Sequence, residues 1–181
     1  MPELLDVVKP NSREGRENNN LKPWSSIVGR LVRAIDKNLG NGEVADLRRM
    51  RPNDPACPAF WKIMAEYWDM HFNDEEAMLR ACLLSGLART KNLHSFHISL
   101  GNALAIAEYS DLRFVRLLRA EGKTLFKEIE LMADFLNSKT QPANWTEVAE
   151  LLFTRELEKT ESLKRRIARN YYATKHAKKE K

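Results

Sequence analysis

Apolar residues recur at intervals of three and four over most of the chain, which is the spacing of helices that bury one face. The clearest stripe runs from Ile27 to Leu39 and predicts a helix that opens at Trp24 or Ser25. Gly40 is expected to end this helix, because glycine readily takes the backbone conformation of a helix C-terminus. No segment shows the strict alternation of a half-buried β-strand, so the pattern predicts an all-α fold.

The remaining apolar stripes bring the expected number of helices to about eight. Several of them follow a residue that suits a helix start, either a capping side chain or a proline in the first turn. A chain of 181 residues can bury a core without disulfides or metal, and it suits one compact domain or two small subdomains that share the core. The expected helices cover 43–50, a segment from Pro58, a segment capped by Asp74 that ends at about Arg89, segments capped by Ser99 and Asp111, about 125–136, Thr146 to about Arg155, and about Thr160 to Ala173.

Cysteine content, hydropathy and the N-terminal residues limit the class of protein. Cys57 and Cys82 allow at most one bridge, which rules out a secreted disulfide scaffold. No run of about 18 apolar residues is present, which excludes a membrane span, and residues 1–6 lack the pattern of a signal peptide. A reducing, cytoplasmic setting is therefore expected. Residues 1–23 are polar without a sustained period, which predicts a loose N-terminal arm.

The charge of the chain is unevenly distributed. Lys and Arg number 30 against 25 Asp and Glu, a net charge of +5. Residues from Arg155 onward hold 10 basic and 4 acidic side chains, a net of +6, whereas residues 1–154 hold 20 and 21, a net of −1. A local positive field concentrates polyanions, so nucleic acid is the first partner to consider, with acidic protein or acidic lipid second.

The titratable residues form no catalytic pattern. His94 and His97 have the spacing of two metal ligands on a helix, but no third ligand stands at a recognisable spacing, and the segment is interpreted as a polar loop. Both cysteines have apolar neighbours and are interpreted as small core residues. The sequence also has no glycine-rich phosphate loop and no dinucleotide fingerprint. It therefore predicts a protein that is not an enzyme and holds no cofactor or metal.

Basic residues form stripes or clusters on three of the expected helices. On two of them the basic residues repeat at three or four on the edge away from the apolar stripe. A solvated helix face is the better interpretation of any single stripe, whereas three together with a basic C-terminal segment favour a surface for a polyanion. The groups are Arg30, Arg33 and Lys37, then Arg48, Arg49 and Arg51, then Arg113, Arg116 and Arg119; Lys91 lies in the loop after residue 89, and the C-terminal segment includes Arg165, Arg166 and Arg169.

Other interpretations of these residues stay open. Tyr109, Tyr171 and Tyr172 lie among the charges and could stack on bases, although tyrosines that cap a core are commoner. A helical transcription regulator would need a helix-turn-helix with base-reading residues, and the basic segment 48–51 is too short and is followed by proline. A metal-dependent hydrolase built on the paired histidines is the remaining alternative, and the zinc content of the protein would separate it from the others.

Several segments, taken in order, resemble one protein family. The match spans about residues 24–173 and also includes Trp145. The matching segments are 42–49 (GEVADLRR), 58–61 (PAFW), 98–105 (ISLGNALA), 112–120 (LRFVRLLRA) and 165–172 (RRIARNYY). On these segments the chain resembles the CasB family, the small subunit of the type I-E CRISPR Cascade complex.

The resemblance implies an all-α subunit with two small packed helical subdomains, expected here at 24–92 and 93–175 with a basic tail at 176–181. It implies a non-catalytic protein that works with other Cascade subunits, a second copy of itself and the guide RNA complex. Its basic surface would steady the target and displaced DNA strands of the R-loop in antiviral defence. A helical nucleic-acid-binding regulator or adaptor outside CRISPR is the alternative function.

The resemblance also bears on individual residues. Arg49 and Arg113 match arginines of the family's basic surface directly, and Arg119 matches more loosely. The next helix has Glu130 and Leu131 where the family has arginine. With the basic stripes, the expected nucleic-acid-binding residues are Arg30, Arg33, Arg49, Lys91, Arg113, Arg116, Arg119, Arg165, Arg166 and Arg169.

Overall fold

The structure is a computed structural model that describes residues 24–52 and 57–180. The expected N-terminal arm at 1–23 and the last residue of the expected tail lie outside the described residues. The described part contains nine α-helices, one π-helical turn and no β-strand, so the expected all-α fold is confirmed. The elements are α1 (Trp24–Arg33), η1 (Ala34–Asn38), α2 (Asn41–Arg49), α3 (Pro58–Tyr67), α4 (Asp74–Arg89), α5 (Leu100–Ile106), α6 (Asp111–Arg119), α7 (Gly122–Ser138), α8 (Trp145–Phe153) and α9 (Leu157–Lys179).

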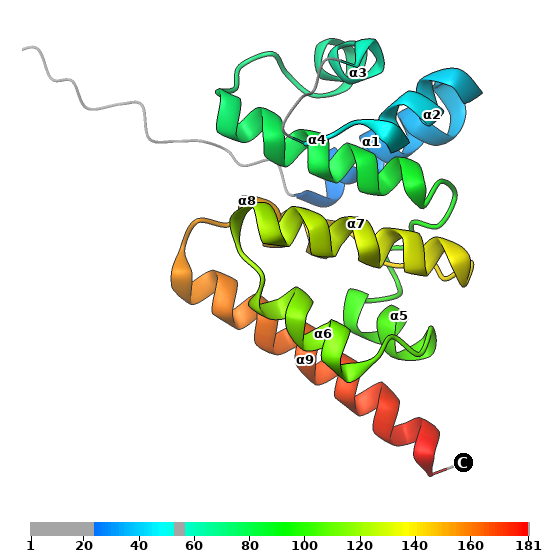
Figure 1. Ribbon diagram of the computed structural model, residues 1–181, viewed down its shortest axis with the longest axis vertical. Coiled ribbons are helices and arrows are strands. Elements are labelled where there is room, and N and C mark those ends of the chain that lie inside the picture. The colour runs from blue at the N-terminus through cyan, green and yellow to red at the C-terminus, as the bar shows by residue number, and fades with distance from the viewer. Residues whose placement is uncertain (1–23, 53–56, 181) are drawn as a thin grey trace, which may run out of the picture.

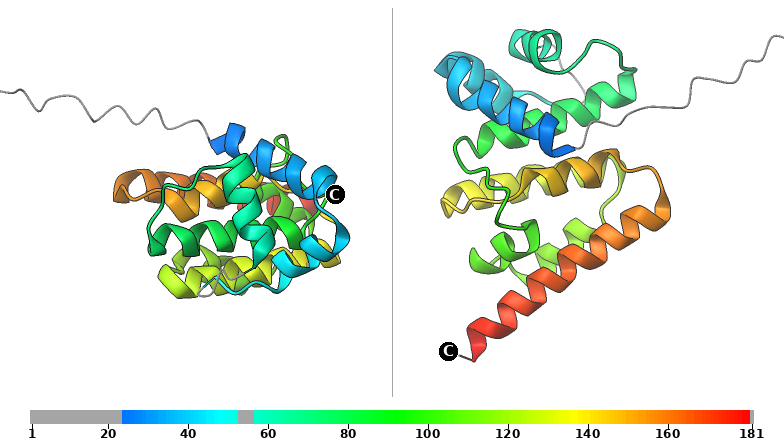
Figure 2. Two further views of the ribbon diagram at one scale, coloured as in Figure 1. Left: turned by 90° about the horizontal axis from the view of Figure 1, so that it is seen from above. Right: turned by 180° about the vertical axis from the view of Figure 1, so that it is seen from behind.

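The helices form successive layers along the long axis of the molecule. Helices α1 to α4 lie at one end, α7 and α8 lie across the middle, and α5, α6 and α9 lie at the other end (Figures 1 and 2). Buried apolar residues from all three layers form one core cluster. Leu83, Leu104, Leu117 and Ile129, from four different helices, are at most 1% exposed, so the apolar stripes that contain them indicate the buried sides correctly.

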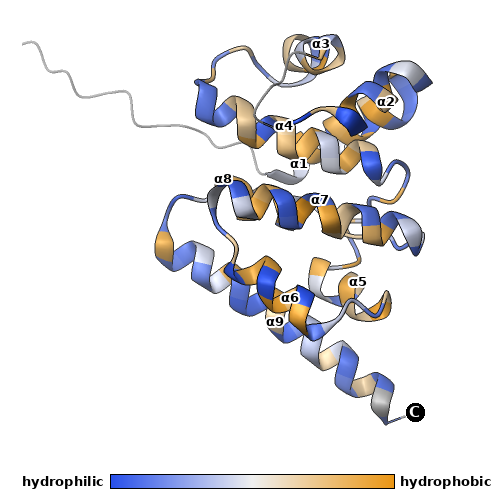
Figure 3. Cartoon of the chain, viewed as in Figure 1, coloured by the Kyte–Doolittle hydropathy of each residue, from blue (hydrophilic) through white to orange (hydrophobic). Residues whose placement is uncertain are grey.

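Hydrophilic positions cover much of the second half of α9, whereas hydrophobic positions concentrate where the helices face one another (Figure 3). None of the described helices combines the length and the apolar character of a membrane span.

Of the expected capping residues, Ser99 is confirmed and two others are shifted by one residue. Ser99 caps α5 as expected, since its hydroxyl accepts a hydrogen bond from the N–H of Asn102. The caps of α4 and α6 are Asn73 and Ser110, each one residue before the aspartate expected to cap the helix. Asp74 and Asp111 instead occupy the first turn, where a carboxylate suits the positive end of the helix dipole.

The first apolar stripe does not form one continuous α-helix that Gly40 ends. After Arg33 the backbone widens into the π-helical turn η1, and the N–H of Leu39 donates to the carbonyl of Ala34. Gly40 is the residue that precedes α2, and its N–H donates to the carboxylate of Glu43 at 2.8 Å. The expectation for Gly40 was wrong because a glycine between two helices suits the start of the second as well as the end of the first.

The last helix is longer than its apolar stripe predicts. It begins at Leu157 and continues to Lys179, so the segment from residue 176 expected to be a tail starts inside α9. Contacts from far along the chain hold its final turns. Lys175 Nζ lies 2.5 Å from Asp111 Oδ1, and Lys178 Nζ donates to the carbonyl of Ile106 at the C-terminal end of α5. A cation suits that end of a helix.

The two expected subdomains are joined by aromatic and ionic contacts. Trp24 stacks on Phe153 with ring centroids 4.5 Å apart. From the end of α4, the Arg89 guanidinium reaches Asp134 at 2.7 Å and Glu130 at 2.8 Å, both on α7. The expected boundary between residues 92 and 93 stays a prediction.

Candidate nucleic-acid interface

Helix α6 presents three arginines on the side opposite its buried residues. Phe114 and Leu117 are buried and fix the orientation of the helix. Because the arginines repeat every three residues, they follow one outward edge, as the sequence predicts. All three side chains are exposed, but their surroundings differ.

Arg116 is committed to a contact inside the protein. Its guanidinium donates to the carboxylate of Glu128 on α7, with Nη2 and Oε1 2.5 Å apart, and this hydrogen bond raises the pKa of Arg116. Glu128 is only 4% exposed, and its second oxygen has no hydrogen-bond partner in the described part of the chain. A buried carboxylate without a partner is costly, so Arg116 stabilises the fold and competes poorly for phosphate.

Arg113 and Arg119 have no ion-pair partner within the described residues. Arg113 lies beside the ring of Phe135 on α7, with its guanidinium carbon 6.0 Å from the ring centroid. Arg119 ends α6, where it is exposed. Two guanidinium groups on one helix edge therefore remain able to bind an anion.

The arginines of α9 also differ in whether they form ion pairs within the protein. Arg165 and Arg169 are exposed, one helical turn apart, and neither forms an ion pair in the described part of the molecule. Arg166 lies on a different side and contacts Glu150 at 2.9 Å and Glu147 at 3.4 Å on α8. The sequence places all three in one basic segment, but the structure leaves only Arg165 and Arg169 free to bind a partner.

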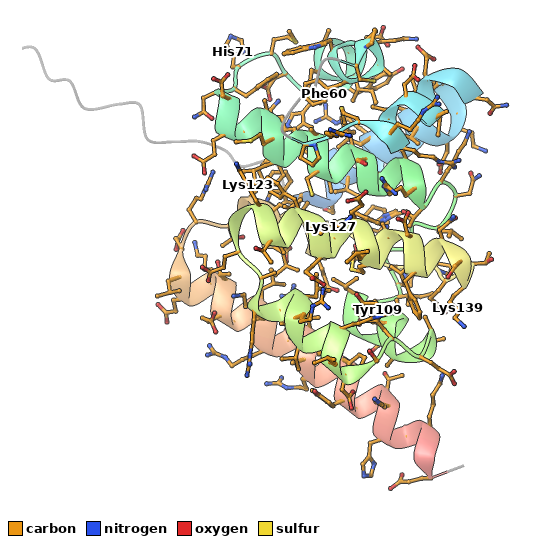
Figure 4. The ribbon with its side chains drawn as sticks, in the orientation of Figure 1. Phe60, His71, Tyr109, Lys123, Lys127 and Lys139 are labelled. Carbon is orange, nitrogen blue, oxygen red and sulfur yellow. The ribbon has the colours of Figure 1, made fainter. Side chains whose placement is uncertain are left out.

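Helices α6 and α9 are neighbours and contact each other through aromatic side chains. Phe114 stacks on Tyr171 with ring centroids 3.8 Å apart, and the Tyr171 hydroxyl donates to the carbonyl of Tyr109. Tyr109 lies between the layers (Figure 4) and is buried, as is Tyr171, so both are core residues. Tyr172 is 46% exposed, and its spacing from Arg169 and Arg165 places it on the same side of α9.

The basic residues of the N-terminal half are dispersed. Arg33 is exposed on α1, whereas Arg30 is half-buried and its buried Nε has no hydrogen-bond partner in the residues described. Arg49 is exposed and pairs with Asp46 at 3.3 Å within α2. Lys91 is half-buried in the loop after α4. Arg48 has a different role, because its Nε donates to the carbonyl of Ala88 at 2.7 Å and ties α2 to the end of α4.

One cation near α6 was missed in the sequence. Lys139, which follows α7, has its Nζ 5.9 Å from the centroid of Phe135, the ring that Arg113 approaches (Figure 4). Arg113 and Lys139 are 26 positions apart, so spacing along one helix could not place them on a shared ring. Lys139 adds a third accessible charge beside Arg113 and Arg119.

The paired histidines have separate environments. His94 is half-buried, its Nδ1 accepts a hydrogen bond from the N–H of Trp145, and burial lowers its pKa. His94 lies in the loop between α4 and α5, as the sequence predicts, and its ring also helps to start α8. His97 is exposed. Among the described residues no group of three or more His, Cys, Asp or Glu could hold a metal ion.

The two cysteines do not pair with each other. Cys82 is buried in α4, and burial raises the pKa of its thiol to about 12. Cys57 is half-buried just before α3. A thiol whose pKa is near 12 stays protonated at neutral pH, which is typical of a core residue and not of a nucleophile.

Comparison with solved structures identifies the class of fold. The chain is similar to a chain in the crystal structure of E. coli Cascade bound to a PAM-containing dsDNA target, with a TM-score of 0.63 and 22% sequence identity. The similarity covers 81% of this chain and 95% of that chain, so the two share an all-helical fold. No curated protein matches the chain.

A protein-family model then gives the family. The model described as CRISPR-associated protein Cse2 matches residues 43–172, which is more than half of the chain. The chain belongs to the Cse2 family, also called CasB, of the type I-E Cascade complex. The resemblance seen in the sequence is thereby confirmed.

Proposed function

We propose that this chain is a non-catalytic small subunit of type I-E Cascade that holds the backbone of the target and displaced DNA strands. It would act beside other Cascade subunits, a second copy of itself and the guide RNA complex. The observation that carries this proposal is the set of exposed arginines on two neighbouring helices that have no ion-pair partner in the described residues. The set consists of Arg113 and Arg119 on α6 and Arg165 and Arg169 on α9.

Phosphate contacts suit a subunit that must serve any guide. They add affinity without reading sequence, because the backbone is the same for every target. R-loop formation exchanges one duplex for another of similar stability, so a few backbone contacts are enough to shift the balance. The edges of α6 and α9 offer guanidinium groups for such contacts. Arg33, Arg49 and Lys91 extend the proposed surface to the other half of the molecule.

The test uses assembled Cascade and two matched pairs of substitutions. One variant carries Arg113→Ala with Arg119→Ala, and a second carries Arg165→Ala with Arg169→Ala. The control carries Arg155→Ala with Lys159→Ala, which removes two exposed charges that are paired with Glu75 and Glu156. R-loop stability is measured over a salt series. Each lost contact should flatten the log–log slope by roughly 0.7–0.9, so each test variant should lose roughly 1.4–1.8.

The expected result is that both test variants assemble and bind the guide normally, form weaker R-loops and show flatter salt slopes, while the control matches the wild type. R-loops as stable as those of the wild type in both test variants would overturn the proposal. Tight, salt-resistant binding of the free protein to one DNA sequence would favour the regulator or adaptor instead. Cleavage of the bound DNA by the isolated subunit would overturn the non-catalytic assignment.

A further inference from the structure

A groove with an apolar floor lies where α4, α7, α8 and α9 meet. Its cavity volume is about 520 Å³. Met78 and Leu79 of α4, Phe126 of α7 and Leu152 of α8 form part of its lining. Leu157, at the start of α9, also lines it and is 77% exposed. When another apolar segment covers a side chain that is this open to water, the free energy of the system falls.

The N-terminal end of α1 lies next to this groove. Trp24 stacks on Phe153, and Phe153 stands between Leu152 and Thr154, both of which line the groove. The start of α1 and the turn from α8 to α9 accordingly lie on the same side of the molecule (Figure 2). The chain that precedes Trp24 is therefore attached beside the cavity.

That preceding chain is polar over most of its length, but it contains one short apolar segment with acidic residues. Residues 4–8 read LLDVV, so four of five side chains are apolar, and Glu3 and Asp6 add negative charge. The lining of the groove carries three basic residues, Lys123, Arg155 and Lys164, and three acidic ones, Glu75, Glu121 and Glu161. Arg155 pairs with Glu75, and Lys164 pairs with Glu161. Lys123 is exposed at the start of α7 (Figure 4), with no ion-pair partner in the part of the chain described. The segment and the groove are thus complementary in hydrophobicity, and Lys123 is a cation that Glu3 or Asp6 could pair with.

The length of the connection permits binding within one chain. Sixteen positions separate Val8 from Trp24. A flexible chain of that length has an average span of roughly 20–24 Å and a fully extended one of roughly 50 Å. Such a short tether gives an effective concentration in the millimolar range, so even a weak contact would be occupied.

We propose that residues 4–8 of this chain bind in the groove formed by α4, α7, α8 and α9. The N-terminal segment would then shield an apolar surface that other proteins could otherwise reach. Residues 4–8 lie outside the stretch 43–172 that the Cse2 family model matches, so this contact is a property of the individual chain and does not depend on the proposed DNA binding.

The methionines allow a direct test by NMR of ¹³C-methyl-methionine protein. Met78 lines the groove, whereas Met64 and Met132 are fully buried elsewhere in the core. The full chain is compared with a chain that lacks residues 1–8 and with the variant Leu5→Asp/Val8→Asp. Comparison with Met78→Leu assigns the signal. The control is Asn19→Ala/Asn20→Ala, which changes the arm but not its apolar segment.

The Met78 methyl signal should move in both test proteins and stay in place in the control. Unchanged Met64 and Met132 signals show that the core remains folded. A synthetic peptide of residues 1–12, added to the shortened chain, should restore the original Met78 signal. The same peptide should bind the full chain roughly tenfold more weakly, because the chain's own segment competes at millimolar effective concentration.

Two outcomes would overturn the proposal. The first is a Met78 signal that is identical in the full and the shortened chain. The second is a difference that disappears when the full chain is diluted, because the segment would then come from a second copy.

Discussion

Gly101 on α5 faces the carbonyl oxygen of Ile167 on α9 so closely that a Cβ atom at Gly101 would lie only 2.2 Å from that oxygen. It would also lie 2.9 Å from the backbone nitrogen of Tyr171. Both neighbours are backbone atoms, which no change of side-chain rotamer can move away. The absence of a side chain at position 101 therefore sets how near α5 and α9 can approach.

We expect Gly101→Ala to destabilise the protein by roughly 2–3 kcal/mol, because α9 must shift away from α5 to make room. Gly42→Ala is the matched control, since a Cβ there meets no atom within 4 Å. Alanine inside α2 should leave stability unchanged or raise it by up to about 1 kcal/mol. Denaturant unfolding of both variants measures the difference, and equal stabilities would contradict the close approach of α5 and α9.

Arg116 and Arg119 should respond differently to substitution even though both are exposed arginines of α6. Arg116→Ala leaves the buried carboxylate of Glu128 without its hydrogen-bond donor, so the melting temperature should fall by roughly 3–6 °C. Arg119→Ala should lower it by less than about 2 °C. Calorimetry of the two variants checks this order. Tests of DNA binding should therefore leave Arg116 in place, because Arg116→Ala also lowers the stability of the fold.

Stability should fall in mild acid because of His94. Burial lowers its pKa below the usual 6.5, and Asp36 only partly offsets this. The folded state therefore takes up a proton less readily than the unfolded state. The contribution of neutral His94 to the free energy of unfolding is fully present above pH 6.5 and is lost as the pH falls below that value. The loss of melting temperature between pH 7.5 and pH 5.5 should be smaller in His94→Gln than in the wild type. His97→Gln, which changes an exposed histidine, should behave as the wild type.

The two thiols should differ in reactivity. In the native protein at pH 8, an alkylating reagent should modify Cys57 but leave Cys82 unmodified, because Cys82 is buried and its pKa is near 12. Mass spectrometry should show one adduct in native buffer and two in denaturant. Rapid modification of both thiols in the native state would show that α4 opens readily.

Local patterns predicted most of the fold. Ser99 was recognised as a cap because the bond it makes reaches only three residues along the chain. Asn73 and Ser110 were missed because each is followed by an aspartate, and either residue of the pair suits a cap. The final turns of α9 were missed for another reason, since Lys175 binds Asp111, 64 positions away.

The basic surface was predicted in outline but not in detail. Arg113, Arg116 and Arg119 have identical spacing, so the sequence gives no reason to separate them. Their difference depends on Glu128, which a neighbouring helix brings beneath Arg116. Arg166 differs from Arg165 for the same reason, because only Arg166 points toward the acidic residues of α8. Which cations are free is a tertiary property, and it required the packed helices.

The position of α9 also has a consequence for the order of folding during synthesis. Ile106 ends α5, and Leu157 begins α9 51 positions later. The ribosome therefore finishes α5 well before it makes the helix that covers Gly101. Until then the small buried face of α5 is exposed to water and to other nascent chains. We expect the layer of α5, α6 and α9 to close only after α9 has emerged from the ribosome, while α1 to α4 already have the helices that they need to start folding.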